Sequence, residues 1–87
     1  MAWHVYILRC ADNTLYTGIA TDVSARVATH NAGKGAKYTR GRLPVALVYA
    51  EAAENHGAAL KREYAIKRLR VSEKRQLLSR QHGPATR

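Results

Sequence analysis

Residues 3–10 and 15–20 are rich in aromatic and β-branched side chains, and a break at residues 11–13 separates the two runs. This pattern is typical of two strands and predicts a β-hairpin with a three-residue loop. With that loop, Tyr6 and Tyr16 point to the same face of the hairpin. A loop of two or four residues would place the two tyrosines on opposite faces, so their proximity depends on the turn.

A helix is expected over about residues 22–32. Thr21 or Asp22 is a suitable N-cap, and the sequence Asn-Ala-Gly at 31–33 is a normal C-terminal signal. The short apolar stripe of this helix consists of Val23, Val27 and Ala28.

The next segment changes from cationic to apolar. Residues 34–42 contain four cations and two glycines without an apolar period, which predicts a basic loop. Residues 45–50 form a near-continuous apolar run of strand length after Pro44. We expect a third strand there, either in the centre of the sheet or beside the hairpin.

Two further helices are predicted near the C-terminus. Glu54 or Asn55 can cap the first, which extends to about Arg70, and the second is a short helix after Ser72. The first has an expected apolar side made of Ala58, Ala59, Leu60, Ile66 and Leu69. Gly83-Pro84 is expected to end the second helix.

The element order ββαβαα predicts an α+β domain in which helices pack on a small antiparallel or mixed sheet. We expect this domain to occupy residues 1–80 and a flexible tail to occupy residues 81–87. Its one cysteine, Cys10, excludes an internal disulfide framework and a cluster of sulfur ligands for structural zinc. A reducing, cytoplasmic environment fits that composition.

The net charge of the chain indicates which class of partner it binds. The 87 residues include 15 Lys and Arg against 6 Asp and Glu, a formal net charge of +9. Such a concentrated positive field attracts phosphate backbones, so we expect a nucleic acid partner. A membrane partner is not expected, because the chain has no apolar run of spanning length and no phenylalanine for an amphipathic membrane-surface helix.

Three polar side chains fall on helix faces that point toward the protein. Glu63 lies within the apolar arc of its helix, where a carboxylate is unfavourable unless it has a partner or a function. Its position is explained either by an i, i+4 ion pair with Lys67 or by a role as metal ligand or general base. Arg26 and His30 flank a valine stripe, and each has an ordinary explanation: snorkelling for the arginine, partial burial for the histidine.

Together with Tyr6 and Tyr16, these side chains suit phosphoryl chemistry better than any of them does alone. The sequence contains no Walker loop and no nucleophile elbow, so it gives no support for nucleotide hydrolysis or serine hydrolase chemistry.

The ordered motifs resemble those of the GIY-YIG nuclease superfamily over residues 3 to about 70. They are Val5-Tyr6-Ile7, then Tyr16-Thr17-Gly18, then Arg26 and His30 on the following helix and Glu63 on the next. The run at residues 33–42 is similar to that of the small stand-alone branch related to structure-specific repair nucleases.

This resemblance implies a metal-dependent DNA endonuclease with a three-stranded antiparallel sheet flanked by helices. It implies that Tyr6 or His30 helps to deprotonate the attacking water, and that Tyr16 positions the nucleophile and phosphate. It further implies that Arg26 stabilises phosphate charge and that Glu63 binds one Mg²⁺ or Mn²⁺ ion. A single carboxylate is sufficient because magnesium retains several waters and also binds phosphate oxygens.

The candidates for contacting DNA are the cations of the expected basic loop, Lys34, Lys37, Arg40 and Arg42, and Lys67 on the helix that follows the third strand. Tyr38 is available to stack on an unpaired base. Without an evident reader helix, single-stranded or branched DNA in repair or processing is a better substrate than a specific duplex sequence. The alternative is a non-catalytic DNA- or RNA-binding module. Dependence on a protein partner, and a homodimer, also stay open.

Overall fold

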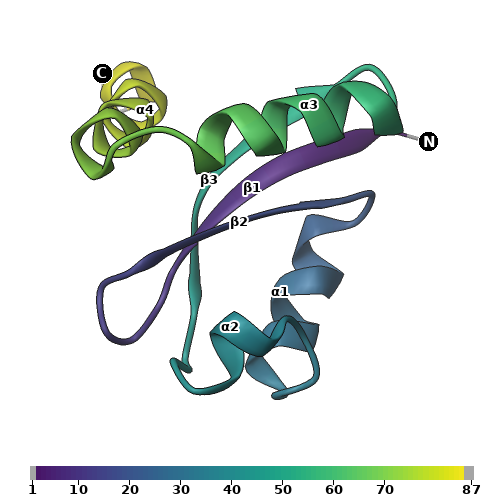
Figure 1. Cartoon of the computed structure of the whole chain (residues 1–87), viewed down its shortest axis with the longest axis vertical. Coiled ribbons are helices and arrows are strands. Elements are labelled where there is room, and N and C mark those ends of the chain that lie inside the picture. Colours follow the sequence, from purple (N-terminus) through teal and green to yellow (C-terminus); the bar gives the residue numbers. More distant parts are fainter. Residues whose placement is uncertain (1, 86–87) are drawn as a thin grey trace.

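The computed structural model describes residues 2–85 and the side chains of residues 2–79. Its centre is a three-stranded antiparallel sheet in the order β2-β1-β3, with β1 at Trp3–Arg9, β2 at Leu15–Ala20 and β3 at Ala46–Ala53. Figure 1 shows helices on both sides of this sheet. The third strand therefore lies beside the hairpin, at an edge, and β1 is central because it pairs with both neighbours.

The predicted hairpin register is confirmed. The Cys10 amide donates to the Thr14 carbonyl at 2.8 Å, and Tyr6 pairs with Gly18 in the ladder. Asn13 takes a positive φ of 70°, the left-handed conformation that asparagine tolerates in tight loops. The two tyrosines of the hairpin therefore share one face.

Within residues 2–85, four helices accompany the strands: α1 at Val23–Asn31, α2 at Lys37–Arg40, α3 at His56–Lys67 and α4 at Val71–Ala85. The Asp22 and Asn55 side chains cap α1 and α3, accepting from the amides of Ala25 and Ala58. Both are short polar side chains that satisfy amides left free in a first helical turn. The expected helix at residues 22–32 is confirmed with these caps.

The expectation of a basic loop over residues 34–42 is wrong in its centre, where α2 forms one helical turn. The hydroxyl of Thr39 donates to the Ala36 carbonyl at 2.8 Å, and the Thr39 side chain is fully buried. A turn of this kind has no apolar period and depends on one buried hydroxyl, so the composition of the segment did not predict it.

Other boundaries also shift. The third strand extends to Ala53 instead of Ala50, α3 ends at Lys67 instead of Arg70, and α4 begins at Val71, before Ser72. The last helix also continues through Gly83 and Pro84 to Ala85, which places residues 81–85 of the expected tail in a helix. The expected end of this helix at Gly83-Pro84 is therefore wrong.

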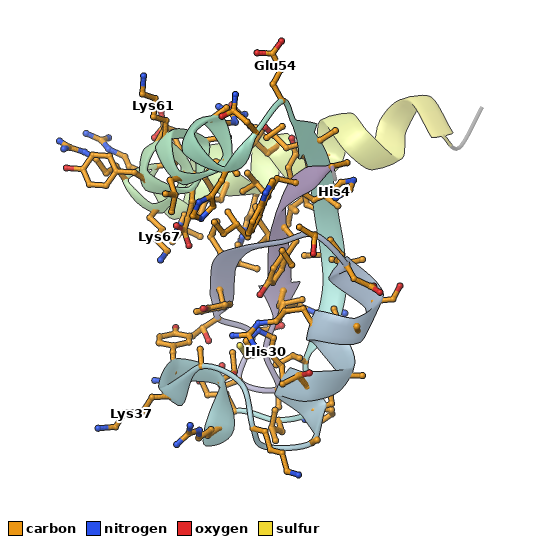
Figure 2. The ribbon with its side chains drawn as sticks, turned by 90° about the vertical axis from the view of Figure 1, so that its right-hand side faces the viewer. His4, His30, Lys37, Glu54, Lys61 and Lys67 are labelled. Carbon is orange, nitrogen blue, oxygen red and sulfur yellow. The ribbon has the colours of Figure 1, made fainter. Side chains whose placement is uncertain are left out.

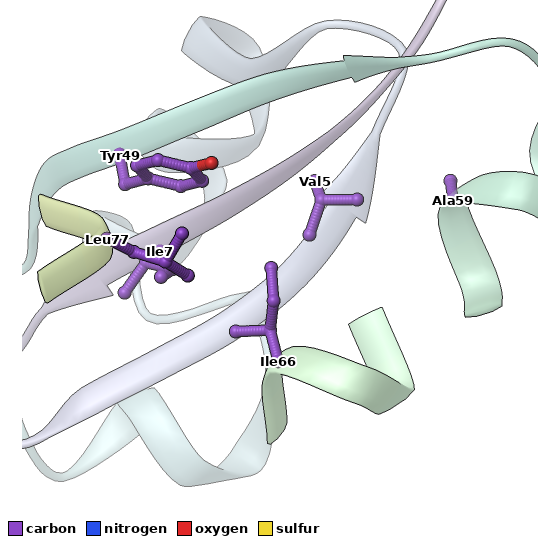
Figure 3. Close-up of a cluster of buried hydrophobic side chains, with 6 residues drawn as sticks. All are labelled: Val5, Ile7, Tyr49, Ala59, Ile66 and Leu77. Atoms are coloured by element: carbon purple, nitrogen blue, oxygen red, sulfur yellow. The ribbon is translucent and has the colours of Figure 1, made fainter. Parts of the chain in front are cut away.

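Two apolar clusters occupy opposite faces of the sheet. On one face, Val5 and Ile7 pack with residues of α3 and α4, as Figure 3 shows for Ala59, Ile66 and Leu77. On the other face, Tyr6 and Leu8 pack with Val23 and Val27 of α1. Alternate residues of β1 thus serve different cores, as the pleat of a strand covered on both faces requires.

The apolar sides of α1 and α3 are narrower than expected. Leu60 is 45% exposed and Ala28 is exposed, whereas Ala59 and Ile66 are fully buried. Each residue advances a helix by about 100°, so the neighbour of a buried position points well away from the sheet. A bidentate ion pair adds to the attachment of α3: Arg62 donates to both Glu51 oxygens, at 2.8 and 3.2 Å. The Tyr49 hydroxyl donates to the same carboxylate.

Candidate functional site

Tyr6 and Tyr16 meet over Gly18 on the face of the sheet that α1 covers. A Cβ placed on Gly18 would lie 2.6 Å from the Tyr6 hydroxyl oxygen and 3.2 Å from a ring carbon of Tyr16. Only glycine leaves room for this arrangement. Tyr6 is fully buried and Tyr16 is half-buried, so the pair spans from the core to the surface.

His30 lies beneath the two phenols and contacts both. Its Nε2 is 2.9 Å from the Tyr6 hydroxyl, its Nδ1 is 2.9 Å from the Thr39 hydroxyl, and its ring meets Tyr16 edge-on at 5.3 Å between centroids. The His30 side chain is fully buried, on the inner face of α1. The expected inward position of His30 is confirmed.

The hydrogen-bond network assigns the tautomer of His30. The Thr39 proton goes to the Ala36 carbonyl, so the Thr39 oxygen accepts from Nδ1–H. Nε2 is then the unprotonated nitrogen, and it accepts from the Tyr6 hydroxyl. The Ala36 amide also points at Nδ1 and would need an acceptor there, but its distance of 3.4 Å is at the outer limit of a hydrogen bond. We therefore assign the tautomer from the shorter contact with Thr39.

Burial keeps both members of this pair neutral. It raises the pKa of Tyr6 above 10.0, an effect that the neighbouring Arg26 guanidinium opposes and the Tyr16 phenol reinforces. Burial, followed by the positive charge of Arg26, lowers the pKa of His30 below 6.5. Near neutral pH the site therefore contains a phenol that donates to an imidazole, which is an arrangement suited to passing a proton from oxygen to nitrogen.

Charged residues from two helices act on the same phenol. Arg26 of α1 is half-buried and close enough to interact with the Tyr6 hydroxyl, and the negative charge of Glu63 on α3 also acts on its pKa. Tyr6, Tyr16 and His30 are thus in contact, and Arg26 interacts with the Tyr6 hydroxyl. Glu63 acts on Tyr6 through its charge alone, from a helix on the opposite face of the sheet. We call these five residues the tyrosine site.

Glu63 also makes the ion pair that was the alternative explanation for its position. Lys67 Nζ lies 3.3 Å from Glu63 Oε2 and 6.0 Å from the centre of the Tyr16 ring. In Figure 2, Lys67 points from α3 toward the half of the molecule that contains His30. Lys67 therefore lies at the tyrosine pair, not on a separate basic surface of α3.

The donor chemistry of this site fits magnesium better than zinc. Within residues 2–79, no three His, Cys, Asp or Glu side chains are grouped in a way that could hold a metal ion, so a zinc-type ligand set is absent there. The Glu63 side chain is 19% exposed and can be reached from solvent. Mg²⁺ and Mn²⁺ accept one protein carboxylate when waters and phosphate oxygens complete the shell.

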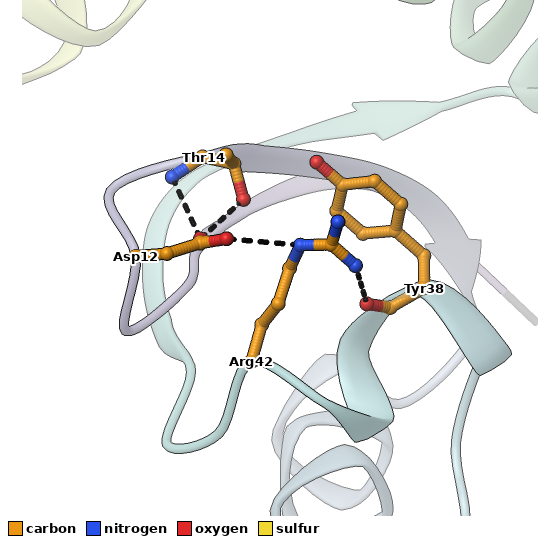
Figure 4. A network of polar contacts seen from close by, with 4 residues as sticks. All are labelled: Asp12, Thr14, Tyr38 and Arg42. Atoms are coloured by element: carbon orange, nitrogen blue, oxygen red, sulfur yellow. Dashed lines mark hydrogen bonds and ion pairs between the residues drawn. The ribbon is translucent and has the colours of Figure 1, made fainter.

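The basic segment is partly ordered by contacts of its own (Figure 4). Arg42 donates to Asp12 Oδ2 at 3.0 Å and to the Tyr38 carbonyl at 2.7 Å, and its guanidinium lies 4.1 Å from the Tyr38 ring centre. The Tyr38 ring is also stacked on Tyr16, at 5.9 Å. Arg42 and Tyr38 are thereby joined to the site and not suspended in a mobile loop.

The other cations of the segment point outward. Lys34, Lys37 and Arg40 are exposed, and Figure 2 shows Lys37 extending away from the ribbon. The Arg40 Nε donates to the Gly35 carbonyl at 3.3 Å, which leaves its other guanidinium nitrogens available for a ligand.

Sequence reasoning missed two residues that support the site. Thr39 fixes the tautomer of His30, and Gly35 packs against the imidazole so closely that a Cβ would lie 2.2 Å from Nδ1. Both occur in the cationic run, where the four cations dominate the pattern and neither residue stands out. A sequence periodicity does not reveal a contact between residues of different structural elements.

The motifs, the fold and the clustered side chains agree with a family match. Residues 2–76 match the GIY-YIG catalytic domain. The chain belongs to the GIY-YIG family. This family domain is a nuclease fold, and the match covers all five residues of the tyrosine site.

Similar proteins carry the name UPF0213. A UPF0213 protein of Desulfotalea psychrophila is 55% identical over 78 residues, covering 88% of this chain and 71% of its own. One from Staphylococcus haemolyticus is 54% identical over 79 residues, covering 90% and 96%. The solution NMR structure of a UPF0213 protein from Bacillus halodurans has a TM-score of 0.62 at 47% identity, covering 98% of this chain and 90% of that one.

A second solution NMR structure, of a protein from E. faecalis, has a TM-score of 0.63 at 37% identity and covers 94% of this chain and 88% of its own. The small stand-alone form of the GIY-YIG fold is therefore shared by these proteins. None of the helices within residues 2–85 has the length and apolarity needed to cross a bilayer.

Proposed function

We propose that this protein is a divalent-metal-dependent endonuclease that hydrolyses phosphodiester bonds of DNA. One observation carries the proposal: a buried, neutral imidazole accepts a hydrogen bond from the Tyr6 phenol, and Arg26 and Glu63 act on that same phenol. A proton acceptor, a phenol, a cation and a carboxylate can together supply the proton transfer, the charge stabilisation and the metal anchor for phosphodiester hydrolysis. An ordinary core tyrosine would not require all of them.

The geometry favours Tyr6 over His30 as the group that contacts the attacking water. Both ring nitrogens of His30 are occupied by protein partners, whereas the Tyr6 oxygen, which donates to Nε2, can still accept a hydrogen bond from water. Tyr6 takes the proton from water as its own proton passes to Nε2 of His30, which keeps the phenol from carrying an isolated negative charge. Tyr6 is itself fully buried, so substrate binding must move a side chain that covers it, and the half-buried Tyr16 is its neighbour at the surface.

Arg26 and Glu63 have complementary tasks. The Arg26 guanidinium stabilises the negative charge that accumulates on the phosphate during attack. Glu63 holds Mg²⁺ or Mn²⁺, which polarises the phosphate and stabilises the leaving oxygen when bound. Lys67 neutralises the Glu63 carboxylate in the free protein and is placed to turn to a phosphate of the substrate.

Single-stranded or branched DNA in repair or processing is the proposed substrate. Arg40, Lys34 and Lys37 offer exposed cations beside the site, which recognise a backbone but not a sequence. The helix nearest to these cations, α2, has four residues, too few to read bases in a major groove.

Cleavage by purified protein tests this proposal. Single-stranded, flapped, branched and duplex DNA are incubated with the protein in MgCl₂, in MnCl₂ and in EDTA. Glu63→Gln removes the charge that holds the metal without removing cations, so cleavage should fall at least about a hundredfold while DNA binding persists. Glu54→Gln is the matched control, because Glu54 is exposed at the far end of the molecule from His30 (Figure 2).

Two results would contradict the proposal. Equal cleavage by wild type and Glu63→Gln would exclude Glu63 as the metal ligand. Intact substrates in every lane, with DNA binding retained, would instead establish the non-catalytic binding module.

A further inference from the structure

A cleft of about 550 Å³ lies between the tip of the hairpin and α4, outside the tyrosine site. Its volume is in the range of sites that bind small organic molecules. The hairpin contributes Arg9, Asn13, Thr14 and Leu15, α4 contributes Val71, Lys74, Arg75 and Leu78, and Tyr38 completes the wall. Its residues therefore come from three segments that are distant in the sequence.

The walls combine positive charge with apolar surface. Arg9 lies on one side and Lys74 and Arg75 on the other, and the lining residues include no acidic side chain. Arg9 and Arg75 are exposed, so their guanidinium groups can reach a ligand. Between the cations, Val71 is 60% exposed although it is apolar. Phosphate and a flat apolar group are the two components that such a surface complements.

Tyr38 joins the cleft to the tyrosine site. Its ring lines the cleft and is also stacked on Tyr16, whose ring lies beside His30. A strand that has its phosphate at the tyrosine pair can therefore continue past Tyr38 into the cleft. Arg42, held over the Tyr38 ring, adds a fourth cation along this path.

We propose that the cleft binds an unpaired nucleotide of the DNA strand that enters the tyrosine site. Arg9, Lys74 and Arg75 contact the flanking phosphates, and the base lies against Val71 and the edge of the Tyr38 ring, whose faces contact Tyr16 and Arg42. This inference rests on the proposed nuclease function. The cleft would be the part of the nuclease that selects unpaired DNA. In a duplex the faces of the bases are stacked on one another, so only an unpaired base can offer its apolar face to Val71.

The test measures binding of two DNA hairpins by fluorescence anisotropy in the Glu63→Gln background, where the DNA stays intact. One hairpin is blunt, and the other carries a tail of four unpaired thymidines. The tailed hairpin should bind about tenfold more tightly. Lys74→Ala combined with Arg75→Ala should reduce that ratio to near one and lower the salt slope of tail binding by about 1.4, at about 0.7 per lost phosphate contact with a single strand.

Two further variants separate charge from shape. Lys61→Ala combined with Arg68→Ala removes the same charge from exposed positions outside the cleft, one on α3 and one directly after it, and should leave the ratio of affinities unchanged. Val71→Ser removes the apolar wall at an exposed position, and should reduce the ratio without changing the salt slope.

An unchanged ratio in the Lys74→Ala, Arg75→Ala variant would overturn the proposal. It would also be overturned if a polyglutamate peptide displaced the tail as effectively as oligothymidylate, because the cleft would then be a site for acidic peptides. A preference for the tail that depends on the cleft, in a protein whose wild type cuts no DNA, would support the cleft and refute the nuclease function.

Discussion

The close packing of glycines against the tyrosine site can be tested with three Gly→Ala substitutions of identical chemistry. At Gly18 the added Cβ would lie 2.6 Å from the Tyr6 hydroxyl oxygen and 2.7 Å from Tyr6 Cζ. At Gly35 it would lie 2.2 Å from His30 Nδ1 and 2.9 Å from the His30 Cα. At Gly41 no atom lies within 4 Å, and the φ of −92° suits alanine. Gly41→Ala is therefore a matched control.

The contacts rank the expected losses of stability. Insertion of a methyl group into a packed core costs about 1–3 kcal/mol, and Gly18→Ala belongs in this range because the Tyr6 ring is fully buried and cannot swing away. Gly35→Ala should cost more than Gly18→Ala, because it also meets backbone that a side-chain rotation does not relieve. Gly41→Ala should be neutral or stabilising by about 0.4–1 kcal/mol, because alanine lowers the conformational entropy of the unfolded chain.

Urea denaturation followed by circular dichroism measures these differences, and thermal melts provide a second estimate. A loss of 1 kcal/mol corresponds to a decrease in Tm of about 4–8 °C in a domain of this size. Gly18→Ala should also lose cleavage, since the Tyr6 hydroxyl must move from its 2.9 Å contact with His30 Nε2. A Gly18→Ala protein as stable and as active as Gly41→Ala would refute the assigned packing of the two tyrosines.

Two further outcomes are expected from charges at the site. Because burial lowers the pKa of His30 below 6.5, the unfolded chain binds a proton that the folded chain does not. The free energy of unfolding should therefore fall as the pH drops below about 6.5, and should stop falling when the pH reaches the lowered pKa. The slope is at most about 1.4 kcal/mol per pH unit. Urea unfolding of His30→Gln should show a shallower pH dependence than wild type, and parallel curves would contradict this. Lys67→Ala should change the free energy of unfolding by less than about 0.5 kcal/mol, because it removes only an i, i+4 ion pair with Glu63. The released carboxylate should bind Mn²⁺ about twofold more tightly in calorimetry. Weaker Mn²⁺ binding would show that Lys67 supports the metal site instead of competing for Glu63.

Most of the fold could be predicted from local signals. The polar break after Cys10 set the hairpin loop, and with it the register that places Tyr6 and Tyr16 on one face. Asp22 and Asn55 marked two helix starts, because short polar side chains satisfy free amides there. These features depend on neighbours within a few residues, and such neighbours can be read directly from the chain.

The candidate site was only partly accessible in this way. Glu63 was recognised as an unusual carboxylate with two explanations, an ion pair with Lys67 and a role as metal ligand or general base. The structure contains the ion pair, and the metal or base role stays a prediction. The pattern could not choose between them, because i, i+4 spacing is fixed within α3 whereas the distance to Tyr6 depends on how α3 packs on the sheet.

The sequence by itself determined the strands, the principal helices, the positive charge and the types of residue available for chemistry. Only the tertiary structure decided that Thr39 sets the tautomer of His30, that Tyr38 stacks on Tyr16, and that α4 closes a cationic cleft against the hairpin. The physical reason is range. Caps, turns and periodicities are contacts between near neighbours, whereas a shared proton, a stacked ring and a cleft require segments distant in the chain to pack at one place, and no local pattern specifies that packing.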